Sequence, residues 1–261
     1  MNDFYTDTLQ YLLRKKLITE HMRILVVCGG EHDKQALEQT GFRDVTISNL
    51  DRRMKGIQFA PFAWSFQDAE NLTFKDNEFD FCIIHDGLHH CQSPHRALTE
   101  AYRVAREGLL VVEPRDSLAS RLARALNFAQ DYEVSGLSWN DYAYGGVKNT
   151  EVPNFVYRWT EREVKKTVAS FAPWGHHRFF FFYRLRIPWM RLRALKNKLW
   201  LVATIAGFPF LKLFTLIFPR QCNSFGFAVL KPQIPRDVLP WIVFREGAPR
   251  INKDWVQKRY R

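Results

Sequence analysis

Residues 23–51 read RILVVCGGEHDKQALEQTGFRDVTISNLD, and they decide the fold. An apolar run at 23–28 ends in Gly29 and Gly30, which predicts a buried strand followed by a tight loop. A helix is expected at 34–40, ended by Gly41, and a second strand at 45–48. This order is typical of a nucleotide-binding half, in which backbone amides of the loop and the helix start face the ligand. Asp51 follows the loop by about 20 residues, where an acidic side chain can accept both ribose hydroxyls.

The alternation of short apolar runs with amphipathic segments continues along the chain. It predicts an α/β fold with a mostly parallel sheet and helices on both faces. A first helix at 7–18 would be capped by Asp7, and a helix at 94–106 would start at Pro94 and be ended by Gly108. Further strands are expected at 63–66, 79–85, 109–112, 176–186 and 224–230, further helices at 117–128 and 160–171, and a loop or lid at 136–153.

The segment that follows the second strand carries a family resemblance. It contains Asp68-Ala69-Glu70, then FKDNEFD at 74–80, Leu88-His89-His90, Pro94, and Glu113-Pro114. In this order the motifs resemble the class I S-adenosylmethionine-dependent methyltransferases that act on small molecules, lipids and sugars, over residues 22–115. The resemblance implies a Rossmann-like fold with a seven-stranded sheet, S-adenosyl-L-methionine as cofactor, and contact of residues 68–70 with adenine.

The glycine loop departs from the family pattern. Val26 stands where the family has an acidic residue, and Cys28 and His32 stand where it has glycines; Gly30 matches, with Gly29 beside it. Glu31 or Asp33 could replace the missing carboxylate. The predicted cofactor-binding residues are Cys28, Gly29, Gly30, Asp51, Asp68, Ala69, Glu70 and His85. The altered loop also keeps open a second hypothesis, that the fold has lost its cofactor and serves as a binding module.

Histidines gather after the fourth expected strand. If the methyl acceptor is a hydroxyl, a base of near-neutral pKa assists the transfer, and we predict His85 and His89 as catalytic residues. The alternative is that these histidines only pack or cap. A metal site built from the set His85, His89, His90, Cys91 and His95 is disfavoured, because no carboxylate is suitably spaced, and no metal is predicted.

Tyr144 and Lys148 match the Tyr-x-x-x-Lys pattern of short-chain dehydrogenases. That pair must lie on one helical turn, and the two glycines between Tyr144 and Lys148 disfavour a helix. The dehydrogenase interpretation is therefore rejected.

Charge is unevenly placed in this chain of net charge +11. Residues 1–150 hold 17 Lys and Arg against 21 Asp and Glu, whereas residues 151–261 hold 21 against 6. The basic half predicts an anionic partner. Cys28, Cys82, Cys91 and Cys222 form no CxxC pair, which is typical of a reduced cytoplasmic protein, and the N-terminus has no signal-peptide pattern.

An apolar insertion separates the last two expected strands. Residues 199–218 hold one charged residue, Lys212, and are flanked by basic residues that include Lys196 and Arg220. Since the two strands should pair, the insertion must return to the side it left. Gly207 and Pro209 should break it into two short helices, a hairpin that dips into the membrane interface. The alternative is a cap over the active site or a dimer contact.

These observations divide the chain and give a function. The methyltransferase core would be 1–186 and 222–235, with an insertion at 187–221 and a basic tail at 236–261. The favoured function is methyl transfer to a small or lipid-linked acceptor such as a glycan hydroxyl, in the cytoplasm or at the inner face of the membrane. Nucleic acid is a less favoured partner, because the basic cluster adjoins apolar sequence, and RNA methylation is an alternative. The oligomeric state stays open.

Overall fold

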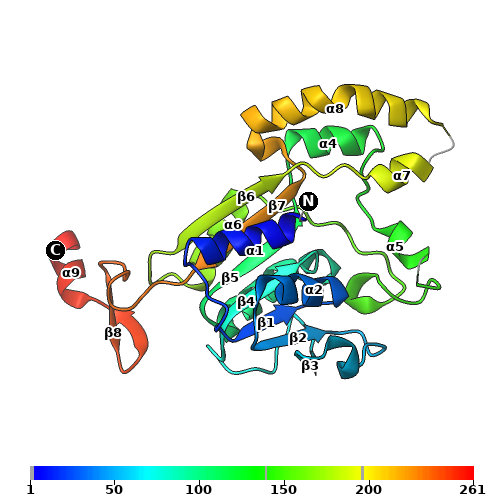
Figure 1. Cartoon of the computed structure of the whole chain (residues 1–261). Helices are drawn as coiled ribbons and strands as arrows, with labels where there is room; N and C mark the ends of the chain where they lie inside the picture. Colours follow the sequence, from blue (N-terminus) through cyan, green and yellow to red (C-terminus); the bar gives the residue numbers. More distant parts are fainter. Residues whose placement is uncertain (1–2, 139, 195–196) are drawn as a thin grey trace.

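The computed structural model describes residues 3–138, 140–194 and 197–261. A seven-stranded sheet in the order β3-β2-β1-β4-β5-β7-β6 forms its centre, as Figure 1 shows. The strands are β1 (Ile24–Val27), β2 (Val45–Asn49), β3 (Ala63–Phe66), β4 (Phe79–His85), β5 (Ala105–Pro114), β6 (Arg178–Arg184) and β7 (Ser224–Leu230). The first five run parallel, and β7 is antiparallel to both β5 and β6. The predicted mostly parallel, seven-stranded sheet is confirmed.

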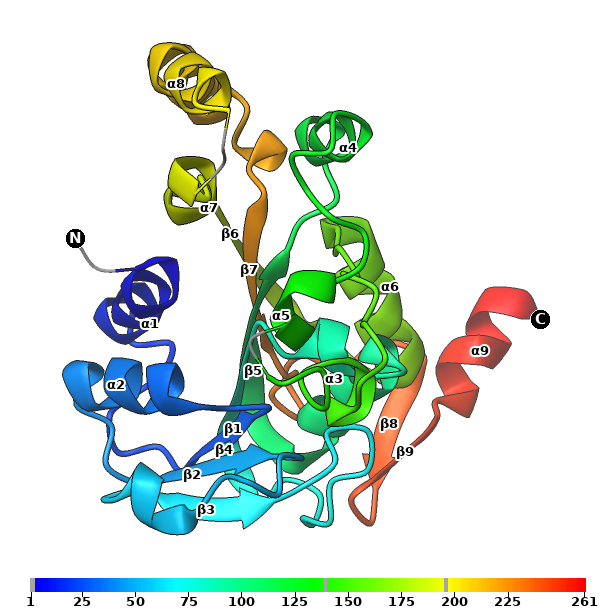
Figure 2. The same ribbon diagram turned by 90° about the vertical axis from the view of Figure 1, so that its right-hand side faces the viewer.

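Helices cover both faces of the sheet, as Figure 2 shows. On one face lie α1 (Phe4–Arg14) and α2 (Glu31–Thr40), whose apolar side chains share a core with one side of β1, β2 and β4. On the other face lie α3 (Pro94–Val104) and α6 (Glu161–Phe171). The other short elements of this part of the chain are α4 (Leu118–Ala125), α5 (Val134–Ser138) and the 3-10 turns η1 (Gly56–Phe59), η2 (Leu88–His90) and η3 (Val147–Asn149).

Capping residues fix where the helices begin and end. Thr160 caps α6 by accepting a hydrogen bond from the Glu163 amide, and Gly41 ends α2 in the left-handed conformation, as expected. The predicted cap of α1 was wrong, because Asp3 rather than Asp7 accepts from the first turn. Asp7 lies inside the first turn, where an acidic side chain is favourable for the helix dipole without capping.

The junction of α3 and β5 differs from the prediction. The helix ends at Val104, and the strand begins at once, with Ala105 paired to Phe79. Gly108 therefore does not end a helix but lies within β5. A methyl group on Gly108 would lie 2.3 Å from the Val229 carbonyl oxygen, so this glycine permits the close approach of β7.

The insertion forms α7 (Trp189–Ala194), α8 (Leu199–Ile217) and the turn η4 (Pro219–Gln221). The predicted break at Gly207 and Pro209 is wrong, because α8 is one helix of 19 residues with Pro209 inside it. Proline removes one backbone hydrogen bond, and a surface helix can satisfy the freed carbonyl from outside. The chain still folds back, since Trp189 of α7 packs on Phe208 of α8 with ring centroids 5.6 Å apart. Lys196 lies outside the described residues.

The C-terminal residues are structured rather than a plain basic tail. Strands β8 (Ile242–Arg245) and β9 (Ala248–Ile251) form an antiparallel hairpin, and α9 (Lys253–Tyr260) follows it. Trp241 and Trp255 pack together with ring centroids 5.7 Å apart. Figure 1 shows this unit at the end of the molecule away from α8.

Two glycines should respond oppositely to alanine substitution. Gly108→Ala should destabilise the fold by about 1–3 kcal/mol, because the added methyl group overlaps β7. Gly207→Ala should be neutral or stabilising by up to about 1 kcal/mol, because the position is helical and has no atom within 4 Å of the added carbon. Urea unfolding of both variants measures this difference. Equal losses of stability would contradict the packing at β5 and β7.

Candidate functional site

A pocket opens at the carboxyl ends of β1, β2 and β3. Parallel strands place all their carboxyl ends at one edge, and a crevice forms where the strand order reverses, here between β1 and β4. The pocket is lined by Cys28, Asn49, Leu50, Gln67, Asp68, Ala69, Glu70, His90, Cys91, Lys148 and Asn149. Four of the predicted cofactor residues, Cys28 and residues 68–70, belong to this lining.

Gly29 is fixed by packing beneath the loop. Its amide donates to the Ser48 carbonyl oxygen at 2.8 Å, which joins the loop to β2. A methyl group here would lie 2.6 Å from Val26 Cγ1 and 2.9 Å from Ile47 Cγ2. The glycine therefore lets the loop lie close over the sheet, and it supports the pocket rather than lining it.

Cys28 occupies a backbone conformation that favours glycine. Its φ is 58°, in the left-handed region, which costs a side-chain-bearing residue about 1 kcal/mol or more. The space opposite is also restricted, because a methyl group on Gly87 would lie 2.6 Å from Cys28 Cβ. The positive φ is the physical reason why a glycine is favoured at position 28, and the contact with Cys28 is the reason why position 87 is glycine.

Gly30 and Asp33 form the start of α2. The Gly30 amide donates to Asp33 Oδ2 at 2.8 Å, and no atom lies within 4 Å of a carbon built on Gly30. Asp33 is buried, and burial raises its pKa even though His85 and the Gly30 amide favour the charged form. Its second oxygen, Oδ1, has no hydrogen-bond partner among the described residues. Glu31, by contrast, is exposed on the surface of the helix.

Asp51, predicted to bind the ribose, pairs with a neighbouring arginine in the structure. Its carboxylate forms a two-point ion pair with Arg53, with Nη2–Oδ2 at 2.6 Å and Nε–Oδ1 at 3.0 Å. This pairing lowers the pKa of Asp51, and Asp51 is absent from the pocket lining. Asn49, the last residue of β2, lines the pocket instead, and its Nδ2 donates to the Gly29 carbonyl oxygen at 2.9 Å. The sequence argument missed Asn49 because it sought an acidic residue.

Arg53 also contacts the segment that contains Tyr144 and Lys148. Its guanidinium lies over the Tyr144 ring, 4.0 Å from the ring centroid. Tyr144 and Lys148 do not share a helical turn, since Gly145 between them has a φ of 94°. This confirms the rejection of the dehydrogenase pattern. Lys148 reaches the pocket, where its Nζ lies 3.1 Å from Asp68 Oδ2 and 3.8 Å from Glu70 Oε2.

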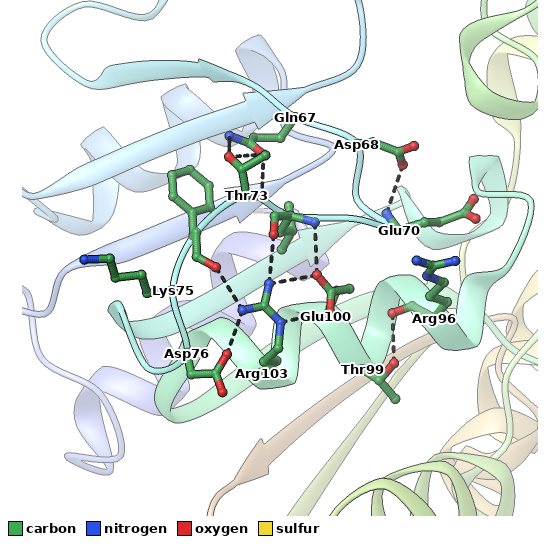
Figure 3. Close-up of polar contacts among 12 residues, drawn as sticks. Gln67, Asp68, Glu70, Thr73, Lys75, Asp76, Arg96, Thr99, Glu100 and Arg103 are labelled. Carbon is green, nitrogen blue, oxygen red and sulfur yellow. Dashed lines mark hydrogen bonds and ion pairs between the residues drawn. The ribbon is translucent and has the colours of Figure 1, made fainter.

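Residues 67–78 form the loop that carries Asp68 and Glu70, and Arg103 of α3 holds it in place (Figure 3). The Arg103 guanidinium donates to the carbonyl oxygens of Leu72 and Phe74, each at 2.8 Å. Glu100 and Asp76 pair with the same guanidinium and raise its pKa. The Glu70 carboxylate accepts a hydrogen bond from the Gln92 amide at 2.6 Å. The sequence did not predict this role, because Arg103 looks like any other charged residue on the polar face of an amphipathic helix.

His85 lies away from the pocket lining. Its ring stacks on Tyr5 of α1 with centroids 4.5 Å apart, and its Nδ1 lies 3.3 Å from His32 Nδ1. Asp33 Oδ1 lies 3.9 Å from the same nitrogen. The residue predicted both to bind cofactor and to act as base is therefore packed beneath α1 and the start of α2.

His89 lies in a buried polar cluster with two carboxylates. Its Nδ1 is 2.6 Å from Glu113 Oε2, and the other Glu113 oxygen accepts the Leu88 amide at 2.6 Å. Glu133 Oε2 lies 3.6 Å from His89 Nε2 and 3.5 Å from His90 Nε2. The sequence argument missed Glu133, because it lies far along the chain in the segment that folds over η2.

These contacts set the charge states of the cluster. Burial opposes a charge on His89, yet Glu113 and Glu133 together raise its pKa well above the usual value. Burial, helped by His89, lowers the pKa of His90, and the neighbouring His89 lowers that of Glu133 to about 2. A histidine held protonated cannot accept a proton near neutral pH, which disfavours His89 as the general base.

Residues 24–112 match the family model described as a methyltransferase domain, and the sheet order is that of the class I fold. These residues have the sequence pattern of a methyltransferase domain, and the sheet has the class I S-adenosylmethionine-dependent methyltransferase fold. This match contains β1 to β4, most of β5 and most of the pocket lining. The later elements, including α8 and the C-terminal hairpin, lie outside it.

Known relatives share part of the sequence. The chain is 35% identical over 113 residues to a ubiquinone/menaquinone biosynthesis C-methyltransferase of a Ruegeria species, a match that covers 37% of this chain. The protein of the same name from Roseobacter denitrificans is also 35% identical, over 104 residues. The chain spans less than half the length of these relatives, 45% and 42% respectively.

Solved structures share the fold. Magnesium protoporphyrin IX methyltransferase of Synechocystis, solved with bound S-adenosylhomocysteine, has a TM-score of 0.50 at 12% identity, covering 88% of this chain and 89% of that one. A protein of an antibiotic biosynthesis pathway in Anabaena variabilis, described as a proposed methyltransferase, has a TM-score of 0.52 at 15% identity, covering 86% and 96%.

Replacing Arg103 should loosen the pocket loop of this methyltransferase domain. Arg103→Leu leaves the Leu72 and Phe74 carbonyls and the Glu100 carboxylate without their shared partner, so we expect a loss of about 2–4 kcal/mol of unfolding free energy. Arg106→Leu is the matched control, because Arg106 is exposed and makes one ion pair, with Asp80. Urea unfolding compares them, and similar losses would contradict the anchoring role.

Proposed function

We propose that this chain binds S-adenosyl-L-methionine and transfers its methyl group to a small, lipid-soluble or lipid-linked acceptor. The observation that carries the proposal is the pocket at the carboxyl ends of β1, β2 and β3 within a class I methyltransferase domain. The bound cofactor supplies an electrophilic methyl group, and the protein contributes mainly by placing the acceptor in line with it. The similar fold of the Synechocystis enzyme, which was solved with the demethylated cofactor, supports this assignment.

The pocket residues fit the cofactor despite the altered loop. Gly29 and the left-handed Cys28 keep the loop low over the sheet, and the open side of Gly30 leaves the start of α2 accessible. We assign the ribose to the Asn49 side chain and the adenine to residues 68–70. Of the two candidates for the missing carboxylate, Asp33 is the better placed, because it is buried at the helix start while Glu31 is exposed.

Asn49 and Asp51 give opposite expectations for cofactor affinity. Asn49→Ala should weaken binding of S-adenosyl-L-methionine about tenfold, the usual cost of one lost hydrogen-bonding partner. Asp51→Ala should weaken it less, because that carboxylate already pairs with Arg53. Calorimetric titration of the two variants and the unchanged chain measures both effects. A larger loss in Asp51→Ala would restore Asp51 as the ribose ligand.

The same titration tests the alternative that the fold has lost its cofactor. Lys148 pairs with Asp68 inside the pocket, so cofactor must displace or accommodate this side chain. Micromolar affinity of the unchanged chain would support the enzyme. A folded protein that does not bind at millimolar cofactor would overturn the enzyme and leave a binding module.

We further propose that α8 docks this cytoplasmic enzyme on the membrane. Among the described residues α8 is the one helix long and apolar enough to cross a bilayer, with mean hydropathy 1.8, and only 6% of that window is buried. A core helix would be mostly buried, so α8 exposes its apolar side chains to something other than the sheet. Among its most exposed side chains are Leu199, Val202, Phe210, Leu216 and Ile217.

Helix α4 adds to the same surface. Leu118, Leu122 and Leu126 recur every four residues and are all exposed, at 71%, 61% and 56%. Figure 1 shows α4 and α8 at the same end of the molecule, and Phe128 after α4 packs on Trp200 of α8 with centroids 4.8 Å apart. Exposed apolar helices with basic neighbours such as Lys198 and Arg220 are typical of proteins that lie in the membrane interface.

This surface bears on the acceptor. A membrane-docked enzyme is suited to a lipid-soluble or lipid-linked acceptor. The relatives of Ruegeria and Roseobacter are named for ubiquinone and menaquinone biosynthesis and for methylation at carbon. The glycan hydroxyl expected from the sequence has no support from these relatives, and RNA is disfavoured because the exposed apolar surface offers it no complementary contact.

Vesicle binding tests the docking surface. The double variant Phe210→Glu, Leu216→Glu should lose at least tenfold in affinity for vesicles that contain anionic lipid, because it removes two large apolar groups and adds like charge. Ile57→Glu is the matched control, since Ile57 is 83% exposed on η1, far from α8 in sequence. The unchanged chain, the double variant and Ile57→Glu would then be compared. If all three bind vesicles equally, or if none of them binds, α8 is covered by a protein partner or acts as a lid.

A further inference from the structure

The cluster of His89, His90 and Glu133 has the geometry of a metal site. Three ligand atoms, one from each residue, all lie within 4.8 Å of one another. Among the ranges 3–138, 140–194 and 197–261, no other group of three histidine, cysteine or acidic side chains meets this condition. Two imidazole nitrogens and one carboxylate are a common ligand set for zinc and related divalent ions.

The distances favour an ion over direct hydrogen bonds. Glu133 Oε2 lies 3.6 Å from His89 Nε2 and 3.5 Å from His90 Nε2, longer than normal hydrogen bonds. Two donor atoms about 2.0–2.2 Å from one tetrahedral ion lie about 3.3–3.6 Å apart, which matches both separations. The cluster is therefore spaced as ligands around a common centre would be.

Neighbouring groups orient two of the three ligands, His89 and Glu133. Glu113 lies 2.6 Å from His89 Nδ1, so this nitrogen donates to the carboxylate, and Nε2, which faces Glu133, is the nitrogen that binds an ion once its proton is displaced. Such a carboxylate–histidine pair is the usual outer support of a zinc-bound imidazole. Asn154 Nδ2 donates to Glu133 Oε2 at 3.2 Å and holds the third ligand. Glu113 and Asn154 therefore hold His89 and Glu133 in the orientation that a shared metal ion would require.

The charges of the cluster call for a cation. Glu113 is fully buried, and Glu133 is half-buried beside it, so two carboxylates face two imidazoles in a low-dielectric region. Two neutral histidines leave a charge of about −2, which one divalent ion neutralises. The same charge attracts a proton in the absence of an ion, so metal and proton compete for His89 Nε2.

We propose that His89, His90 and Glu133 bind a divalent transition-metal ion of the zinc class beside the cofactor pocket. His90 belongs both to this cluster and to the pocket lining, so the ion would lie at the edge of the methyl-transfer site. Three protein ligands leave a fourth position, which water or an oxygen of the acceptor can take. Glu133 belongs to the segment over η2, so the ion also fastens that segment to the sheet. This proposal goes beyond the cofactor and docking assignments and does not depend on them.

The test is metal binding by the full chain, purified without a histidine tag and stripped with chelator. We expect one equivalent of Zn²⁺ per chain with micromolar or tighter affinity, and Co²⁺ should give visible absorption bands of four- or five-coordinate intensity. His90→Ala and Glu133→Gln should each weaken Zn²⁺ binding at least tenfold, and Glu113→Gln should weaken it about 10–100-fold through loss of support.

The matched control is His95→Ala. His95 Nε2 lies 3.5 Å from Glu163, a similar pair that belongs to no three-ligand group in the described chain. It should bind Zn²⁺ like the unchanged protein. Glu133→Gln keeps the size of the side chain, so it remains informative if His90→Ala fails to fold.

Two results would overturn the proposal: no Zn²⁺ bound by the folded chain at micromolar free metal, or binding that neither His90→Ala nor Glu133→Gln weakens. The cluster would then be a plain ion pair of protonated His89 with its carboxylates. Calorimetric binding of S-adenosyl-L-methionine in the presence of chelator tests the methyltransferase assignment separately. Failure of one experiment therefore does not decide the other.

Discussion

Parallel pairing of β1 with both β2 and β4 is the constraint on which the other features of the site depend. It brings the carboxyl ends of these strands to one edge, and the connections leave that edge in opposite directions, so a crevice forms between them. The loop after β1 must then lie close over the sheet. Gly29 allows this approach, and Cys28 accepts a left-handed backbone there in spite of its side chain. Asn49, Asp68 and Glu70 reach the pocket because their strands end beside this loop.

Charged side chains fix the positions of the loops around the pocket. Arg103 holds the loop after β3 by its carbonyl oxygens, so Asp68 and Glu70 keep their places without cofactor. Arg53, which pairs with Asp51, lies over the Tyr144 ring and so connects the end of β2 with the segment that leads to Lys148. These interactions are partly buried and use several bonds to one guanidinium, which makes them stronger than ordinary surface ion pairs. An acidic residue that sequence spacing assigns to the ligand can therefore serve the scaffold instead.

Two features of the protein depend on segments that follow the matched residues 24–112. At one end α4 and α8 expose apolar side chains such as Leu118 and Phe210, the surface that we propose docks on the membrane. Beside the pocket, the segment before α5 brings Glu133 to His89 and His90. Both features come from segments that follow β5, where the regular alternation of strands and helices has ended.

The sequence by itself determined the sheet, the sheet edge at which the pocket lies and the family resemblance, because hydrophobic periodicity and local motifs encode strands, helices and the turns between them. The predicted bounds of β3 and β4 are those of the structure, and residues 68–70, which the sequence singled out, line the pocket. It did not predict that Asp51 pairs with Arg53, that α8 continues as one helix past Pro209, or that Glu133 lies beside His89. Those outcomes depend on contacts between residues far apart in the chain. Such contacts exist only after the segments have packed, so tertiary structure alone decided them.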